Sequence, residues 1–128
     1  MSRVQLALTV GDVDKAIEFY SAMFGTAPAK IRPGYANFAI EDPPLKLVLI
    51  EGDRPGTLNH LGVEVASSEQ VTSEIARLEK QGLDTRVEEE VACCYAVQNK
   101  VWVSDPDGAP WEVYTVLGDS PVGASDCC

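Results

Sequence analysis

The sequence repeats one pattern of secondary structure twice, and this repeat restricts the fold more than any other feature. In the first half, alternating apolar residues at 4–10 predict a half-buried strand, and Asp12 and Gly25 are placed to cap a helix between them. Apolar runs at 35–40 and 45–51 predict further strands, separated by an Asp-Pro-Pro turn. A strand, a helix and then more strands therefore follow one another in this half.

The second half repeats that order. Residues 59–65 alternate as a strand, and Ser67 with Gln70 forms a capping box for a helix that Gly82 ends. Further strands are predicted at 85–89, 97–103 and 111–116. We therefore expect an α+β fold in which two βαβββ modules pair into one curved mixed sheet.

The chain has 128 residues, which is enough for one domain with a hydrophobic core. We assign residues 1–117 to this domain, with the first module at 3–51 and the second at 59–117. Gly, Ser, Asp and Pro predominate from residue 118 onward, so 118–128 is predicted to be a flexible C-terminal tail.

Charge and cysteine usage exclude several classes of partner. A net charge of −10 argues against nucleic acid or an anionic membrane, because both bind basic faces. No run approaches the roughly 20 apolar residues of a membrane span, and the N-terminus has no signal-peptide core. The four cysteines form two adjacent pairs, Cys93-Cys94 and Cys127-Cys128, unlike a secreted disulfide framework. We therefore expect a cytoplasmic protein.

The adjacent thiols of Cys93 and Cys94 carry the most specific chemistry in the chain. Neighbouring cysteines form a strained disulfide, and they lack the C-x-x-C spacing of structural zinc sites. Two thiolates side by side instead suit a soft acceptor such as trivalent arsenic or Cd(II). The alternative is that both are small buried residues, because free cysteine is among the most buried residue types.

A second cluster follows from the repeat. A shift of 55 residues places Gln5 on His60, and the alternation puts both on the strand face that the helices do not cover. Superposing the two Asp-Pro turns places Leu49 on Glu112. If the modules share one curved sheet, Gln5, His60 and Glu112 converge in its hollow. Each also has an ordinary alternative as a polar surface or hydrogen-bonded side chain.

Such a set of oxygen and nitrogen ligands resembles the facial arrangement of non-haem Fe(II) oxygenases. The usual set contains two histidines and one carboxylate, and here Gln5 takes the place of one histidine. Leu49 has no ligand atom, so a coordination position is left to water, O₂ or substrate.

The chain resembles the vicinal oxygen chelate superfamily, which contains glyoxalases, bleomycin-resistance proteins and extradiol dioxygenases. The two modules, the Asp105-Pro106-Asp107-Gly108 turn and Trp111-Glu112 carry this resemblance over residues 3–117. Within the superfamily it is similar to the organoarsenical carbon–arsenic lyases and cadmium-induced proteins. The segments concerned are Ser2-Arg3-Val4-Gln5-Leu6-Ala7-Leu8, Tyr20-Ser21 with Phe24, Pro33-Gly34-Tyr35-Ala36-Asn37-Phe38, Asn59-His60-Leu61-Gly62, Cys93-Cys94-Tyr95-Ala96 and Lys100-Val101-Trp102-Val103.

The resemblance implies an Fe(II)-dependent dioxygenase that breaks the carbon–arsenic bond of trivalent organoarsenicals. Methylarsonous acid and reduced aromatic arsenicals would be its substrates, O₂ its co-substrate and inorganic As(III) its product. It implies that Gln5, His60 and Glu112 bind the metal and act in catalysis, that Cys93 and Cys94 bind arsenic, and that a metal cavity lies within the curved sheet. Members of the superfamily often pair, so we carry over a homodimer as an expectation. No family site matches Cys127-Cys128.

Three other functions remain open at this stage. A resistance protein without catalysis would use the same cysteines to sequester Cd(II) or As(III). A glyoxalase-type lyase or isomerase would use Ni, Zn or Mn, usually with four protein ligands. An antibiotic-binding module would need neither a metal nor the cysteine pair. We also expect the segment with Cys93 and Cys94 to lie on a mobile loop, because capture and release need access.

Overall fold

A computed structural model describes residues 2–123 and divides the chain into two compact units. One unit comprises Val4–Asn59, and the other comprises His60 onward together with the N-terminal residues through Arg3. Cys127 and Cys128, the second cysteine pair, lie outside the described residues.

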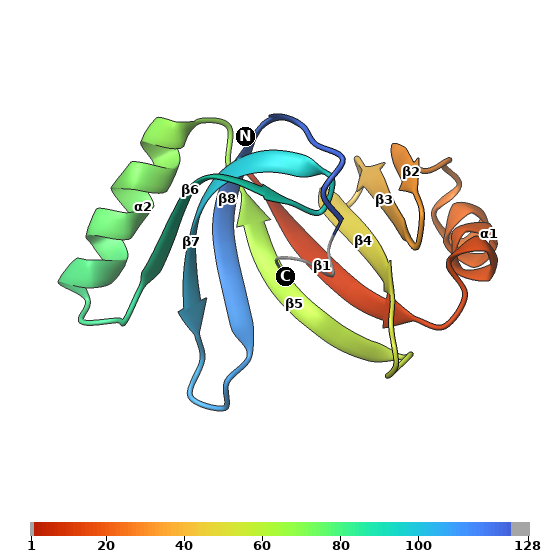
Figure 1. Ribbon diagram of the computed structural model, residues 1–128, viewed down its shortest axis with the longest axis horizontal. Coiled ribbons are helices and arrows are strands. Elements are labelled where there is room, and N and C mark those ends of the chain that lie inside the picture. Colours follow the sequence, from red (N-terminus) through yellow and green to blue (C-terminus); the bar gives the residue numbers. More distant parts are fainter. Residues whose placement is uncertain (1, 124–128) are drawn as a thin grey trace. The chain divides into compact units, whose positions relative to one another are not determined.

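The first unit has the predicted order of a strand, a helix and three strands (Figure 1). Its sheet has the order β2-β3-β4-β1, in which β1 and β4 are parallel and the other pairs are antiparallel. The elements are β1 (Arg3–Val10), α1 (Val13–Phe24), β2 (Lys30–Arg32), β3 (Tyr35–Ile40) and β4 (Leu45–Glu51). The short strand β2 has no alternating pattern of its own and pairs with β3 through a turn at Gly34, whose φ is 66°.

The N-caps of both helices and the C-cap of α1 are those that the sequence predicts, whereas Gln81, one residue before the predicted Gly82, caps the end of α2. Asp12 accepts a hydrogen bond from the backbone N–H of Lys15 at 3.1 Å, which satisfies one of the free donors of the first turn of α1. Gly25 ends the helix in the left-handed conformation with φ of 64°. In α2 (Ser68–Lys80), Ser67 accepts from Gln70 N–H, while the Gln70 side chain accepts from Ala66 N–H.

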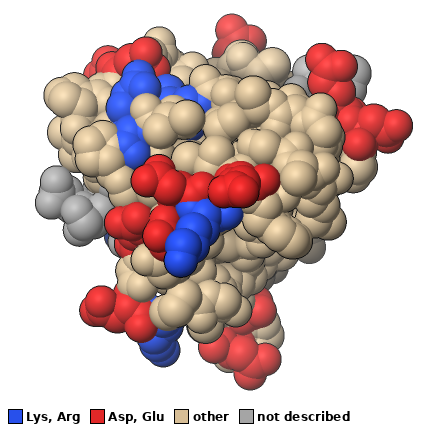
Figure 2. All heavy atoms as spheres, turned by 90° about the vertical axis from the view of Figure 1, so that its right-hand side faces the viewer, with Lys and Arg blue, Asp and Glu red and all other residues tan. Residues whose placement is uncertain are grey.

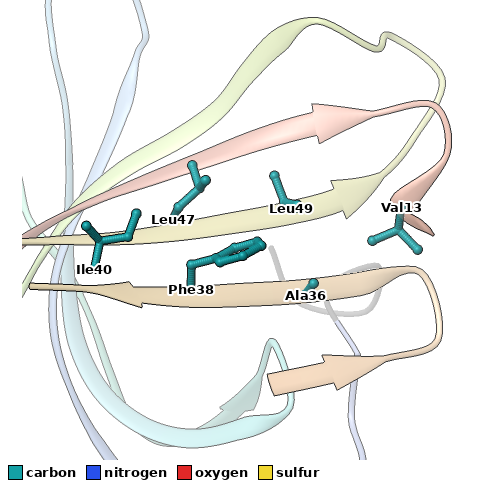
Figure 3. Close-up of a cluster of buried hydrophobic side chains, with 6 residues drawn as sticks. All are labelled: Val13, Ala36, Phe38, Ile40, Leu47 and Leu49. Carbon is teal, nitrogen blue, oxygen red and sulfur yellow. The ribbon is translucent and has the colours of Figure 1, made fainter. Parts of the chain in front are cut away.

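The core of the first unit lies between α1 and the strands β3 and β4. Figure 3 shows its side chains gathered along β3 and β4, with Val13 at the start of α1. The buried members are Val13, Ala36, Phe38, Ile40, Leu47 and Leu49. Full burial of a large apolar side chain contributes about 1.5–3 kcal/mol, so this cluster accounts for much of the stability of the unit.

The second unit repeats the topology of the first. Its sheet has the order β5-β8-β7-β6, with β5 and β8 parallel and the other pairs antiparallel. Its elements are β5 (Thr57–Glu64), α2, β6 (Arg86–Cys93), β7 (Ala96–Ser104) and β8 (Pro110–Asp119), and α2 packs on β7 and β8. Each strand thus has a counterpart in the first unit at the same place in its sheet, so the prediction of two βαβββ modules is confirmed.

The strand register corrects one equivalence between the modules. Leu6 pairs with Leu47 in the first module, and Leu61 pairs with Trp111 in the second. Val48 is therefore the counterpart of Glu112, and the assignment of Leu49 to that place is wrong by one residue. Leu49 belongs to the core covered by α1. Because Val48 is also apolar, the first module still offers no ligand atom at this position.

The last strand is longer than the pattern of apolar residues indicates. β8 continues to Asp119, and its final residues pair with the start of β7. The segment that follows forms backbone hydrogen bonds, in which Ser120 N–H donates to Tyr95 O and Tyr95 N–H donates to Val122 O. The first residues of the predicted tail are thus hydrogen-bonded to the hairpin between β6 and β7.

The face shown in Figure 2 carries acidic and basic side chains interspersed among uncharged residues, with no broad basic area. This distribution agrees with the net charge of −10. Within residues 2–123, no helix has the length and apolar character needed to cross a bilayer.

Phe38→Ala is expected to lower the free energy of unfolding by about 3–5 kcal/mol, because the ring is fully buried and its loss leaves a cavity. The matched control is Phe19→Ala in α1, where the residue is 61% exposed and its ring meets the Tyr20 ring edge to face, and a loss below about 1.5 kcal/mol is expected. Urea denaturation measures both values. Equal losses would contradict the assigned core.

Candidate metal and thiol site

Two neighbouring parallel strands bring His60 and Glu112 together. Gly62 of β5 is paired with Glu112 of β8, and His60 lies two residues earlier on the same face of β5 as Gly62. Nε2 of His60 lies 2.7 Å from Oε2 of Glu112, and the two residues are 2% and 3% exposed. A histidine and a carboxylate buried in contact form one polar unit, since neither has water to solvate it.

Strand β7 contributes a third charged group to this unit. Lys100 is 1% exposed, and its Nζ donates a hydrogen bond to Oε1 of Glu112 at 2.8 Å. Glu112 therefore uses one oxygen for His60 and the other for Lys100. Glu112 can occupy an otherwise apolar strand because its carboxylate is paired with this buried cation.

Aromatic rings surround this polar unit. The Trp102 ring meets the His60 ring edge to face, with centroids 5.5 Å apart, and fixes the orientation of the imidazole. Nζ of Lys100 lies 5.2 Å from the Trp102 centroid and 5.9 Å from that of Tyr114, within the range of cation–π attraction. The indole N–H of Trp102 donates to Glu88 at 2.7 Å, so the ring itself is held in place.

The surroundings keep Glu112 ionised. Burial alone would raise the pKa of its carboxyl group, but the hydrogen bond from His60 and the charge of Lys100 outweigh that effect. Together they lower the pKa of Glu112 from its ordinary value of 4.5 to about 2. An ionised carboxylate opposite an imidazole nitrogen is a donor pair that suits a divalent transition metal.

The third predicted ligand, Gln5, lies in the other unit. It is a buried residue of β1, paired with Lys46 of β4. Its convergence with His60 and Glu112 stays a prediction. Among the described residues, no three His, Cys, Asp or Glu side chains gather into a metal cluster. A set of one glutamine, one histidine and one glutamate contains only two residues of these four types. The second unit thus supplies two of the three predicted ligands.

The predicted thiol pair lies at the tip of the hairpin between β6 and β7. Cys93 is the last residue of β6 and pairs with Ala96, so Cys94 and Tyr95 form a two-residue turn. Their φ angles are 53° and 62°, the left-handed values that a type I′ turn requires and that favour Gly or Asn. The two sulfur atoms are 3.5 Å apart. Cys94 carries a thiol and is partly exposed, whereas Cys93 is buried and disulfide-bonded, so the predicted binding of arsenic by both sulfurs would require reduction of Cys93.

This turn is held by hydrogen bonds on both sides, which differs from the mobile loop expected from the sequence. The side-chain amide of Gln98 donates to the backbone carbonyl of Cys93 at 2.8 Å. On the other side, Tyr95 N–H donates to Val122 O at 2.8 Å. The short turn and these contacts fix the direction of the two sulfur atoms.

Sequence reasoning missed Lys100 and Gln98, which connect the two clusters. They are next neighbours on one face of β7, about 7 Å apart along the strand. Gln98 contacts the thiol turn, and Lys100 contacts Glu112. Within residues 2–123, Oε1 of Gln98 is the buried side-chain atom without a hydrogen-bond partner. The alternation of polar residues in an otherwise apolar strand was the available signal.

The chain belongs to the Glyoxalase/Bleomycin resistance protein/Dioxygenase superfamily, whose pattern it matches over residues 3–113. It is 60% identical over 134 aligned positions to the trivalent organoarsenical cleaving enzyme of Thermomonospora curvata, covering 100% of this chain and 89% of that protein. It is 64% identical to the cadmium-induced protein CadI of Mycobacterium tuberculosis, covering 94% of this chain and 80% of CadI. A probable trivalent organoarsenical cleaving enzyme of Bacillus subtilis is 38% identical.

Solved structures of low sequence identity share the fold. An extradiol ring-cleaving dioxygenase from B. fuscum matches with a TM-score of 0.65 at 20% identity, covering 91% of this chain and 33% of that one. Methylmalonyl-CoA epimerase from Mycobacterium tuberculosis matches with a TM-score of 0.63 at 19% identity, covering 87% of this chain and 85% of that one. These matches, together with the family, confirm the vicinal oxygen chelate fold.

The lowered pKa of Glu112 predicts how stability depends on pH. Because the folded pKa of about 2 lies below the ordinary value of 4.5, ionised Glu112 stabilises the fold above that value, and this contribution is lost as pH falls toward 2. Glu112→Gln is therefore expected to flatten the decline of unfolding free energy between pH 5 and pH 2, as measured by urea denaturation of the metal-free protein. Glu18→Gln, at an exposed position of α1, is the control. An unchanged slope in Glu112→Gln would contradict the buried ion pair.

The positive φ angle of Cys94 predicts a conflict between stability and thiol chemistry. Cys94→Gly and Cys94→Ala remove the same sulfur, but only glycine adopts φ of 53° without steric cost. We expect the glycine variant to be about 1 kcal/mol more stable than the alanine variant by thermal and urea unfolding. An alanine variant of equal or greater stability would show that the turn is not strained.

Proposed function

We propose that the protein is an Fe(II)-dependent dioxygenase that cleaves the carbon–arsenic bond of trivalent organoarsenicals. The observation that carries the proposal is the pairing, within one unit, of a buried His60–Glu112 ligand pair with the Cys93-Cys94 turn. The 60% identity to a trivalent organoarsenical cleaving enzyme supports the same activity. We keep a cytoplasmic location and a homodimer as expectations.

The thiol turn would select the substrate. A trivalent organoarsenical has one carbon substituent and two exchangeable oxygen ligands, so two adjacent thiolates replace both oxygens and leave the organic group in place. Soft thiolates prefer arsenic to the harder metals of the cell. The 3.5 Å between the two sulfur atoms allows both to reach one arsenic atom once Cys93 is reduced.

His60 and Glu112, with Gln5 as the predicted third ligand, would hold the metal. Their imidazole and carboxylate donors fit Fe(II). The contacts of Glu112 with His60 and Lys100 keep the carboxylate ionised, which is the form that binds a metal ion. Bound Fe(II) would supply the activation of O₂. The surrounding Trp102 and Tyr114 rings exclude water from this chemistry.

The overall reaction balances with O₂ as the only oxidant. Methylarsonous acid and one molecule of O₂ contain the same atoms as arsenous acid and formaldehyde, so no external reductant is needed for the cleavage itself. Both oxygen atoms of O₂ enter the products, which is the defining property of a dioxygenase. Holding arsenic at the thiol turn makes the attack effectively unimolecular.

A second candidate function is sequestration of Cd(II) or As(III) without catalysis. The 64% identity to a cadmium-induced protein favours it, as does the soft thiol pair. Sequestration does not require a buried histidine–carboxylate pair with an ionised carboxylate, and this pair is what favours the dioxygenase. A glyoxalase-type lyase with four ligands is disfavoured because Val48, the counterpart of Glu112, has no ligand atom.

Turnover tests the proposal directly. Protein reduced with a phosphine and loaded anaerobically with Fe(II) is expected to convert methylarsonous acid to inorganic arsenite only when O₂ is admitted. O₂ uptake and arsenite release, the latter measured by chromatography with arsenic-specific mass detection, should be equal. Binding of the arsenical without release would favour sequestration, and release in strict absence of O₂ would favour a lyase.

Single variants separate the two clusters in the same assay. Cys94→Ser is expected to lower affinity for methylarsonous acid about 100-fold while Fe(II) binding is kept, because a hydroxyl is a poor arsenic ligand. His60→Ala should weaken Fe(II) binding while the affinity for methylarsonous acid is kept. Gln5→Ala should also weaken Fe(II) binding if Gln5 is the third ligand. Gln81→Ala, at an exposed position at the end of α2, is the control. Full turnover in both Cys94→Ser and His60→Ala would refute the two-cluster mechanism.

A further inference from the structure

Lys100 is a buried cation whose ammonium group is committed to Glu112. Its side chain is 1% exposed, and Nζ donates to Oε1 of Glu112 at 2.8 Å. Ring faces of Trp102 and Tyr114 occupy much of the space around Nζ, at 5.2 Å and 5.9 Å to their centroids. A charge removed from water in this way is retained only beside an ionised partner, so Lys100 depends on the carboxylate.

The carboxylate divides its two oxygens between opposite partners. Oε2 lies 2.7 Å from Nε2 of His60, and Oε1 accepts the hydrogen bond from Lys100. A metal ion that binds Nε2 of His60 therefore meets Oε2, while Oε1 is already occupied. Carboxylates bind metal ions through one oxygen or through both, and an ammonium group on one oxygen leaves only the other.

We propose that Lys100 is a positioning residue that keeps Glu112 a one-oxygen metal ligand and so preserves an open coordination position. Catalytic metal sites differ from structural ones in such an open position, which a two-oxygen carboxylate would fill. The inference rests on the proposed function in one respect, namely that a divalent metal ion binds at His60 and Glu112.

The charge of Lys100 has a second consequence. An ammonium group beside a divalent cation repels it, so Lys100 lowers metal affinity while it preserves the open position. A lysine that merely supported the packing of Glu112 would have the opposite effect, because its loss would disorder the ligand and weaken metal binding. The direction of the change in affinity therefore distinguishes the two roles.

The test uses Co(II) as a spectroscopic probe and azide as a small ligand for the open position. Wild-type protein and Lys100→Met, Lys100→Arg and Lys80→Met variants are titrated with Co(II) without oxygen and then with azide. Lys80, in the last turn of α2, is the matched control, because its loss removes the same charge at an exposed position. Visible Co(II) absorption weakens as the coordination number rises, so it reports whether Oε1 of Glu112 binds the metal in addition to Oε2.

Lys100→Met is expected to bind Co(II) about tenfold more tightly, with weaker visible absorption and an azide affinity at least about tenfold lower. Lys100→Arg keeps the charge and the hydrogen bond and should stay near wild type, as should Lys80→Met. If Lys100→Met does not fold, Lys100→Gln takes its place, and tighter Co(II) binding than in wild type is again expected.

Unchanged absorption and azide affinity, or weaker Co(II) binding, in the uncharged variant would overturn the positioning role while the metal site itself stands. If wild-type protein binds neither Co(II) nor Fe(II), the proposed function fails and the inference fails with it. These measurements need no turnover, so they do not depend on the arsenical chemistry.

Discussion

The candidate site depends on one buried ionic arrangement, the Glu112 carboxylate held between Lys100 and His60. Each of the three groups is nearly or fully buried, so each would be costly alone. Because the carboxylate is shared, the arrangement exists only when three strands are in register. β8 must place Glu112 beside β5 and opposite Trp102 of β7, and the topology of the second unit supplies this order. The fold and the chemistry thus impose the same constraint on the sequence.

Much of both units could be predicted from the sequence, for physical reasons that are local. Alternation showed the strands, the caps at Asp12 and Ser67 showed where the helices start, and a lone histidine in a strand marked a candidate ligand. The partner of Glu112 could not be predicted in the same way. Lys100 reaches it diagonally across the β7–β8 pair, in which Lys100 is opposite Tyr114 and Trp102 is opposite Glu112, and such a register leaves no reliable mark in the sequence. The misplacement of Leu49 arose from the same limit.

The thiol turn shows a different limit of local reasoning. Hairpin turns with two positive φ angles usually carry Asn or Gly, and the residues here are Cys94 and Tyr95. Turn chemistry therefore gave no signal, and the segment was expected to be a loop. Non-glycine residues in this conformation persist where the surrounding structure compensates their cost, and they cluster at functional sites. Gln98 on one side and the segment at Val122 on the other provide that compensation here.

The two clusters require opposite surroundings, and the shared strand β7 explains how one unit provides both. Cys94 lies at a hairpin tip and is partly exposed, which is what the proposed capture of arsenic would require. His60 and Glu112 are buried among aromatic rings, which is what the proposed activation of O₂ by a bound metal would require. On β7, Gln98 contacts the turn and Lys100 contacts the carboxylate from the same strand face. Gln98 and Lys100 are next neighbours on one strand face, so the backbone of β7 fixes the spacing between the contact to the turn and the contact to the carboxylate.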